Sequence, residues 1–250
     1  MTERLVVMLL ALAAVSLAGE FPKPKPPADP SGYGVHLQRT MTLLATSGPQ
    51  KRNKVRILFY GQSITVQKWW KQVEEDLRRR FPNADLECSN LALGGFASQF
   101  LVRTAEYDLY PYYPDLLIFH VYGHHQRYED IIRRTRERTT AEVLIQTDHV
   151  TSEVEDNWTK MMNYTFLPQY AKKYGCQLSH IRESWRQCLN DNGLKPQQLL
   201  ADAVHLNEHG ESLMAQLVSQ ELVCRPDLPP DLPLGLNRWL GAQTQIPRRG

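Results

Sequence analysis

The stretch ILFYGQSITVQKWW, residues 57–70, joins an apolar strand to a helical pattern and places Ser63 at the junction. A backbone that turns at this point exposes the serine hydroxyl at the edge of a sheet, with the amides of a helix N-terminus behind it. The same position also suits a serine that only caps a helix. The stretch alone therefore leaves two interpretations of Ser63, a nucleophile or a helix cap.

The middle of the chain continues this alternation of strands and helices. Apolar runs predict strands, and a four-residue apolar spacing such as Trp69, Val73 and Leu77 predicts a helix. The expected strands are 55–61, 84–93, 115–123 and 141–150, and the expected helices are 66–81, 128–139, 163–175 and 210–223. This order implies parallel crossovers and predicts a three-layer α/β/α sandwich with a mainly parallel sheet.

Composition limits the function classes. The 250 residues, of which 42% are hydrophobic, suit one compact domain, and a net charge of +2 with no basic stripe argues against a nucleic-acid partner. Residues 1–18 combine an arginine, an apolar run and small residues, which predicts a signal peptide and a secreted or periplasmic protein without stable membrane association after cleavage. A membrane anchor that is kept is the alternative.

The remaining segments follow the proline content and the cysteines. We expect a proline-rich N-terminal arm over 19–50, a domain over 51–224 and an extended tail over 225–250. Export permits disulfides, and four cysteines allow three pairings that the sequence leaves open, with Cys176–Cys188 as one guess. No cysteine or histidine spacing indicates a structural zinc site.

Several residues that carry chemistry follow the predicted strands or precede the last helix. Ligands in parallel α/β sheets bind at the carboxyl ends of the strands, so these residues are expected to meet at one edge. They are Gln62 and Ser63, Gly94 and Gly95, His124 and His125, and the pair Asp202 and His205. Each has a structural explanation as a turn, cap or loop residue, but together they favour a catalytic interpretation of Ser63.

From about residue 55 to about residue 223 the chain resembles the SGNH (GDSL-like) hydrolase superfamily, whose sandwich is flavodoxin-like. That family carries a nucleophilic serine in a Gly-Asp-Ser-like block, then a glycine, then an asparagine in Gly-x-Asn, then Asp-x-x-His. Ser63, Gly95 and the pair Asp202/His205 match these positions in order. The resemblance implies a serine hydrolase that needs no cofactor and no metal.

Two positions depart from the family pattern. Gln62 stands where the family usually has aspartate, and His125 stands where it has the asparagine. The segment FYGQSIT looks like a subgroup of exported bacterial proteins associated with carbohydrate esterases. The departures leave open a catalytically inert binding protein on the same fold, although the serine, aspartate and histidine are all present.

The chemistry assigns each residue a role. His205 is the base that a serine nucleophile requires, and Asp202 accepts from its other ring nitrogen. The expected oxyanion hole consists of the backbone N–H groups of Ser63 and Gly95 with the side chain of His125 as a third donor. We expect Gln62, Gly94 and His124 to contact the substrate, and Gln62 and His124 are the alternative third donors.

A zinc peptidase is the remote alternative, because HLNEH, residues 205–209, matches His-x-x-Glu-His. That interpretation needs one continuous helix through the motif, whereas Asn207 is better suited to cap a helix. Export and the family resemblance together imply that the substrate is an ester on an extracellular carbohydrate, most simply an O-acetyl group. A lipid or short-acyl ester is the second choice. Four tyrosines could stack on sugar rings or simply pack their own loop: Tyr107, Tyr110, Tyr112 and Tyr113.

Overall fold

The computed structural model describes residue 21 and residues 23–230. Its centre is a sheet of five parallel strands in the order β2-β1-β3-β4-β5. The strands are β1 (Lys54–Gly61), β2 (Asp85–Asn90), β3 (Leu116–His120), β4 (Glu142–Gln146) and β5 (Gln177–Ser179). This is the flavodoxin-like strand order. The predicted α/β sandwich with a mainly parallel sheet is confirmed.

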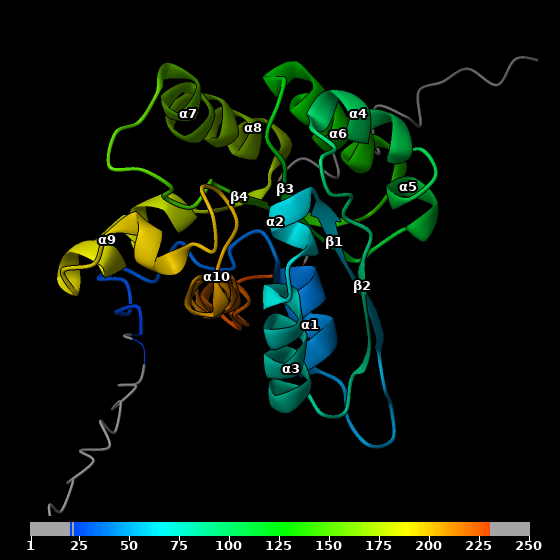
Figure 1. The fold of residues 1–250 in the computed structure, drawn as a ribbon. Helices are drawn as coiled ribbons and strands as arrows, with labels where there is room; N and C mark the ends of the chain where they lie inside the picture. Colours follow the sequence, from blue (N-terminus) through cyan, green and yellow to red (C-terminus); the bar gives the residue numbers. More distant parts are fainter. Residues whose placement is uncertain (1–20, 22, 231–250) are drawn as a thin grey trace, which may run out of the picture.

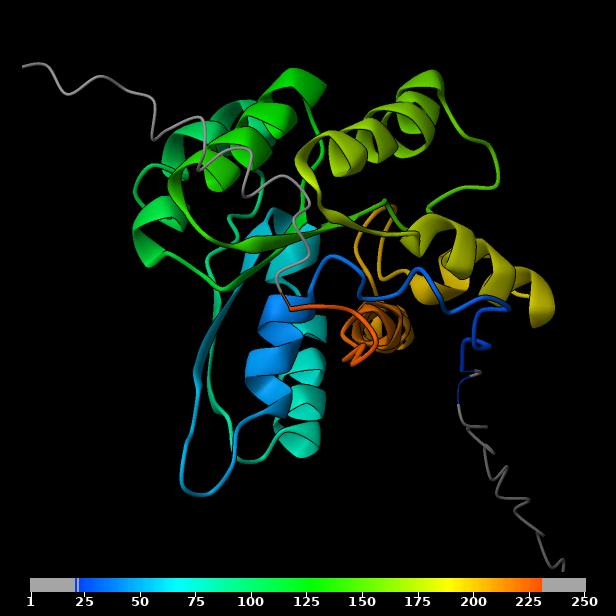
Figure 2. The ribbon, with the colours of Figure 1, turned by 180° about the vertical axis from the view of Figure 1, so that it is seen from behind.

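Helices cover both faces of this sheet, as Figures 1 and 2 show. One face carries α1 (Gln38–Ala45), α3 (Trp69–Arg80), α9 (Ile181–Asp191) and α10 (Glu208–Glu221). The other carries α4 (Ser98–Thr104), α5 (Leu109–Tyr112), α6 (His125–Arg138), α7 (Asn157–Met161), a π-helical turn (Met162–Phe166) and α8 (Leu167–Tyr174). Short α2 (Ser63–Val66) follows β1, and a 3₁₀ turn (Pro196–Leu199) precedes the last loop.

The strands alternate their side chains between two hydrophobic cores. In β1, Ile57 and Phe59 enter the core under α3 and α10, whereas Leu58 and Tyr60 enter the core under α6 and α8. All four side chains are fully buried. A strand that is apolar on both faces therefore fits a sheet covered on both sides, as the sequence indicated.

Several predicted boundaries differ from the structure. The arm expected over 19–50 is not extended throughout, because residues 38–45 form α1, where Met41 and Leu44 are buried in the core. The strand β5 and the helix α9 were not predicted. β5 has three residues and no apolar run, whereas α9 carries Ile181 and Trp185 at a helical spacing that the sequence offered.

The predicted signal peptide, residues 1–18, and most of the predicted tail lie outside the described residues. Within the described part of the chain, no helix has both the length and the apolar character needed to cross a membrane.

The four cysteines are free, so the guessed Cys176–Cys188 pair is wrong. The physical reason is their place in the sandwich. Cys176 is buried in the core beneath α6 and α8, and Cys188 is buried in the core on the opposite face of the sheet. A disulfide requires Cα atoms within about 7 Å of each other, and a sheet between them prevents this.

Candidate active site

Ser63 is the first residue of α2, and only Gln62 separates it from the end of β1. Its position depends on Gly61, which pairs with His120 of β3. A Cβ at Gly61 would lie 2.0 Å from the His120 carbonyl oxygen and 2.5 Å from Thr65 Oγ1. Only glycine therefore lets the strand end lie this close to its neighbour and turn at once into a helix.

Three side chains form an unbroken chain of hydrogen bonds at this corner. Ser63 Oγ lies 2.9 Å from His205 Nε2, and His205 Nδ1 lies 2.8 Å from Asp202 Oδ2. The structure thus brings the predicted serine, histidine and aspartate together across 142 positions of sequence. With Nδ1 protonated and facing the carboxylate, Nε2 is the acceptor for the serine hydroxyl, which is the arrangement a general base requires.

The carboxylate of Asp202 is held by its own loop. Its Oδ1 accepts from the backbone N–H of His205 at 2.7 Å and from that of Val204 at 2.8 Å. These two backbone hydrogen bonds, together with the His205 side chain, lower the pKa of Asp202 to about 2. The group is therefore an anion at any pH near neutrality, although its side chain is largely exposed.

Several contacts fix this loop over Ser63. The side-chain amide of Gln67 bonds the backbone of Leu206 in both directions, accepting from its N–H at 3.0 Å and donating to its carbonyl at 2.8 Å. His149 Nε2 donates to the Val204 carbonyl at 2.8 Å. Asn207 caps α10 by accepting from the backbone N–H of Gly210 at 3.0 Å. The loop is thus held both at its tip and at its entry into α10.

Gln62, at the position where the resemblance expects aspartate, contacts the serine itself. Its Oε1 accepts from the Ser63 backbone N–H at 2.8 Å and lies 2.7 Å from Ser63 Oγ. The single hydroxyl proton can go to only one acceptor, so Gln62 Oε1 and His205 Nε2 compete for it. The Ser63 N–H, which was expected to face an oxyanion, points at Gln62 in this structure.

The two glycines after β2 lie differently. Gly95 has a φ of +78°, lines the cleft above Ser63 and has no atom within 4 Å of the place where a Cβ would be. This backbone conformation favours glycine. Gly94 is exposed and is not among the residues that line the cleft.

His124 and His125 are not brought to Ser63. The His125 ring stacks on Phe166 with centroids 3.8 Å apart, and its Nδ1 lies 2.9 Å from the Tyr170 hydroxyl. Because α6 begins at His125, the side chain is carried toward α8 instead of into the cleft. His124 is the N-terminal cap residue of α6 and lines a different cavity.

The structure adds three residues that sequence reasoning missed. His120 Nε2 lies 2.8 Å from Asp148 Oδ1, and Asn163 donates to Asp148 Oδ2 at 2.8 Å. Burial raises the pKa of Asp148, but the hydrogen bonds from His120 and Asn163 outweigh it, and the pKa is lowered. His149 follows directly and is buried. The available signal was position, since all three end or follow strands β3 and β4.

A cleft of about 560 Å³ opens above the serine. It lies between the loops after β1, β2, β3 and β4 and the loop of residues 200–206, which is the edge where parallel sheets bind ligands. Its lining combines polar and aromatic groups: Ser63, Gly95, His120, Tyr122, Asp148, His149, Trp158 and His205. Its volume falls in the range of small-molecule and cofactor sites.

The zinc interpretation of residues 205–209 requires a helix that is not there. The helix α10 begins at Glu208, so His205 precedes it and His209 lies within it. The His209 ring stacks on Phe21 with centroids 4.5 Å apart. Among the described residues, no group of three or more histidine, cysteine, aspartate or glutamate side chains could hold a metal ion.

Comparison with known proteins identifies structural relatives only. No protein-family model matches the chain. No curated protein matches it either. Among solved structures, an acetylxylan esterase from Geobacillus stearothermophilus superposes with a TM-score of 0.60 at 17% identity, covering 69% of this chain and 97% of the esterase. The acetyl xylan esterase AlAXEase superposes with a TM-score of 0.59 at 20% identity, covering 68% of this chain and 100% of that protein.

Variants of the Geobacillus esterase in which a serine, an aspartate or a histidine is replaced by alanine are described as catalytic mutants. In that protein the aspartate and the histidine are three positions apart. At these identities the superpositions establish the architecture. This chain has the α/β sandwich fold of acetylxylan esterases.

Proposed function

We propose that the protein is a serine esterase that removes an acetyl group from a carbohydrate. The observation that carries the proposal is the hydrogen-bonded chain from Ser63 through His205 to Asp202 at the floor of the cleft. The fold shared with acetylxylan esterases supports it, as does the Asp-x-x-His spacing of the catalytic mutants described for one of them.

In the proposed reaction, Ser63 Oγ attacks the carbonyl carbon of the ester while His205 Nε2 takes the hydroxyl proton. Asp202 stabilises the imidazolium that forms, because its anionic carboxylate accepts from Nδ1. His205 then gives the proton to the departing sugar oxygen, and the acetyl group remains on Ser63 Oγ as an ester. A water molecule, deprotonated by His205, releases the acetate and restores the serine.

The tetrahedral intermediate needs donors for its oxygen. The backbone N–H groups of Ser63 and Gly95 are the proposed pair, and the first becomes available when the Gln62 amide turns away from it. His125 has no part in the proposed oxyanion hole, because its ring stacks on Phe166 and its Nδ1 lies 2.9 Å from the Tyr170 hydroxyl. Gln62 therefore acts in this proposal as the group that a bound substrate displaces.

The lining of the cleft and the expected export of the protein both support an acetylated sugar as the substrate. Polar and aromatic groups line the cleft together, which suits a sugar ring, whose faces stack on aromatic side chains such as Tyr122 and Trp158. Export, expected from residues 1–18, would bring the enzyme to extracellular glycans. An O-acetyl group on such a glycan is the simplest ester that fits both.

The test is acetate release from a panel of acetylated polysaccharides, run beside short-chain and long-chain p-nitrophenyl esters. Wild type should release acetate and be labelled by a fluorophosphonate, whereas Ser63→Ala should do neither, with turnover reduced by about a millionfold. Chelator treatment should leave the rate unchanged, because the proposed acyl transfer uses no metal.

Other outcomes would point elsewhere. Preference for long-chain esters would indicate a lipase, and saccharide binding without hydrolysis would indicate an inert binding protein. Equal turnover by wild type and Ser63→Ala would refute the serine mechanism.

A further inference from the structure

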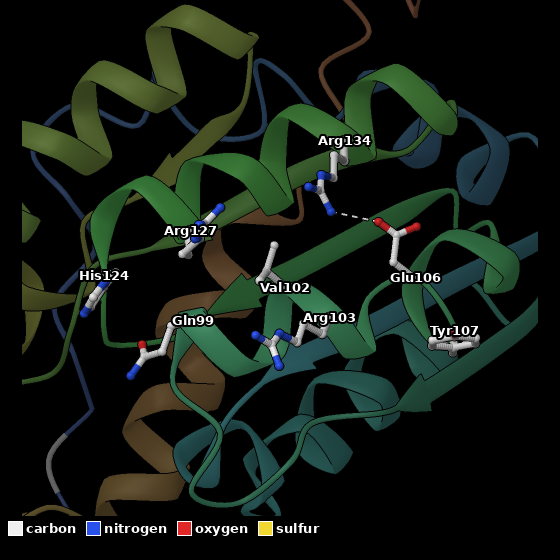
Figure 3. Close-up of a pocket in the computed structure, with 8 residues that line it drawn as sticks. All are labelled: Gln99, Val102, Arg103, Glu106, Tyr107, His124, Arg127 and Arg134. Atoms are coloured by element: carbon white, nitrogen blue, oxygen red, sulfur yellow. Dashed lines mark hydrogen bonds and ion pairs between the residues drawn. The ribbon is translucent and has the colours of Figure 1, made fainter.

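A second cavity, of about 620 Å³, lies between α4 and α6 and includes His124 at the end of the loop that follows β3. Figure 3 shows residues of α4 and α6 along the cavity, with His124 at one end and Tyr107, from the turn after α4, at the other. Arg103 comes from α4, and Arg127 and Arg134 come from α6. We call this cavity the arginine groove.

The groove carries an excess of positive charge. Three arginines and a single glutamate line it. Arg134 donates to Glu106 at 2.8 Å, and Arg138 also contacts Glu106, so the one acidic group is already neutralised. Arg127 contacts Asp130 in an exposed pair at 2.9 Å, which is a weak interaction.

Arg103 has no hydrogen-bond or ion-pair partner for its guanidinium among the residues that the structure describes. An unpaired arginine and a weakly paired arginine that line the same cavity form an arrangement that attracts an anion. A guanidinium matches a carboxylate or sulfate group with two parallel N–H donors.

The groove adjoins the candidate active site. Tyr122 lines the cleft above Ser63 and His124 lines the groove, and their Cα atoms are at most about 7 Å apart along the chain. The helix α4 holds the chain between them, because Ser98 donates from its backbone N–H to the Tyr122 carbonyl at 2.9 Å and from Oγ to the His124 carbonyl at 2.8 Å. Neighbouring residues of one fixed loop therefore line both cavities, so a polymer bound at Ser63 has the groove close beside it.

The far end of the groove carries an aromatic surface. The Tyr107 side chain is 84% exposed, an unusual degree for a large aromatic group, and it stands at the edge of the arginine groove. Exposed aromatic faces stack on sugar rings, whereas arginines select for charge. A groove with both features fits a saccharide that bears anionic groups better than it fits a neutral one.

We propose that the arginine groove binds negatively charged sugar residues that flank the acetylated sugar, so that the substrate is an acetylated acidic polysaccharide. This inference rests on the proposed esterase function for its kinetic consequences, but not for binding itself. Arg103 and Arg127 supply the charge, and Tyr107 supplies the stacking surface. The anionic group is a uronic acid carboxylate or a sulfate ester, which share this chemistry.

Binding is tested first, without any reliance on catalysis. Calorimetry is run on full-length Ser63→Ala with galacturonate oligomers, a sulfated galactan oligomer and a neutral xylan oligomer. We expect binding of one or both anionic oligomers, at least tenfold tighter than the neutral one and weakened by 0.5 M salt. The carboxylate and sulfate arms identify which anion the groove takes. Equal affinity for neutral and anionic oligomers would overturn the proposal.

Variants then place the binding in the groove. In the Ser63→Ala protein, the double substitution Arg103→Ala and Arg127→Ala should weaken the affinity for anionic oligomers by at least tenfold. Lysine at both positions in place of alanine should restore part of this affinity. Arg79→Ala is the matched control, since Arg79 is an exposed arginine of α3 on the opposite face of the sheet. Equal losses from the control and the double variant would show that the groove is not the site.

Kinetics in the wild-type background connect the groove to catalysis. Acetylated pectin with free carboxylates is compared with the same polymer fully methyl-esterified. The double alanine variant should lose at least tenfold in kcat/KM on the free-carboxylate polymer, mainly through KM, and less than twofold on p-nitrophenyl acetate. If Ser63→Ala does not bind the anionic oligomers while the wild type is an active esterase, the groove proposal is refuted and the proposed function stands. If the oligomers bind in the groove while the wild type shows no esterase activity, the proposed function is refuted and the groove proposal stands.

Discussion

His149 makes the loop that carries the candidate catalytic pair sensitive to acid. It is buried, and its Nε2 donates to the Val204 carbonyl, while its Nδ1 has no hydrogen-bond partner among the described residues. Burial is the main cause that lowers its pKa to about 4, and the nearby positive charge of Arg182 acts in the same direction. The hydrogen bond to Val204 opposes the shift but does not overcome it.

The size of the effect follows from the two pKa values. An unfolded chain binds a proton on this histidine near its ordinary pKa of 6.5, and the folded protein does so only near 4. Between these values the unfolded state holds more protons, so the free energy of unfolding falls as the pH falls. At about 1.4 kcal/mol for each pKa unit, the loss between pH 7.5 and pH 4 is about 3 kcal/mol.

The test compares wild type with His149→Gln, whose amide can still donate to the Val204 carbonyl but cannot become charged. Urea unfolding at several pH values from 7.5 to 4 gives the free energy of unfolding for each protein. We expect the difference between them to move by about 3 kcal/mol in favour of the variant over this range. His209→Gln, which replaces an exposed histidine, is the control. A difference that stays constant with pH would refute the reasoning.

Three further predictions test other parts of the structure. Gly61→Ala would put a Cβ 2.0 Å from the His120 carbonyl oxygen, so urea unfolding should show a loss of about 3 kcal/mol or more, and unchanged stability would contradict this packing. Burial raises the pKa of Glu221 from 4.5 to about 7, so this group should cost the wild type about 3 kcal/mol of unfolding free energy as the pH rises from 4.5 to 7. Glu221→Gln should lack this loss, and parallel pH profiles of the two proteins would contradict the raised pKa. His125→Ala should keep kcat within about threefold of wild type, because its ring stacks on Phe166, whereas a hundredfold loss would return His125 to the oxyanion hole.

The sequence by itself determined the architecture and the three residues of the hydrogen-bonded chain. Apolar runs alternating with helical spacing require a parallel sheet covered on both faces, and β1 to β4 with α3, α6 and α10 formed where this pattern placed them. Ser63 and the pair Asp202/His205 follow or precede such elements directly. Since strand ends meet at one edge, position along the chain was enough to bring them together.

Tertiary structure decided where a side chain points when its direction depends on the exact residue at which a helix begins. The choice between His125 pointing into the cleft and His125 packing on Phe166 depends on α6 beginning at that residue, and no periodic pattern specifies a helix start to within one position. His120 and His149 were missed for another reason. In the sequence they look like ordinary residues at or after the end of a strand, and only the pairing of β3 with β4 brings the two strand ends together.

The short elements and the arginine groove also required the folded chain. β5 has three residues and is stabilised by its pairing with β4, so no local apolar run announces it. Arg103 is 24 positions before Arg127 in the sequence, and their own helices give each of them an ordinary surface position. Only the packing of α4 against α6 turns these separate charges into one cavity, because electrostatic attraction for a ligand depends on distance in space and not along the chain.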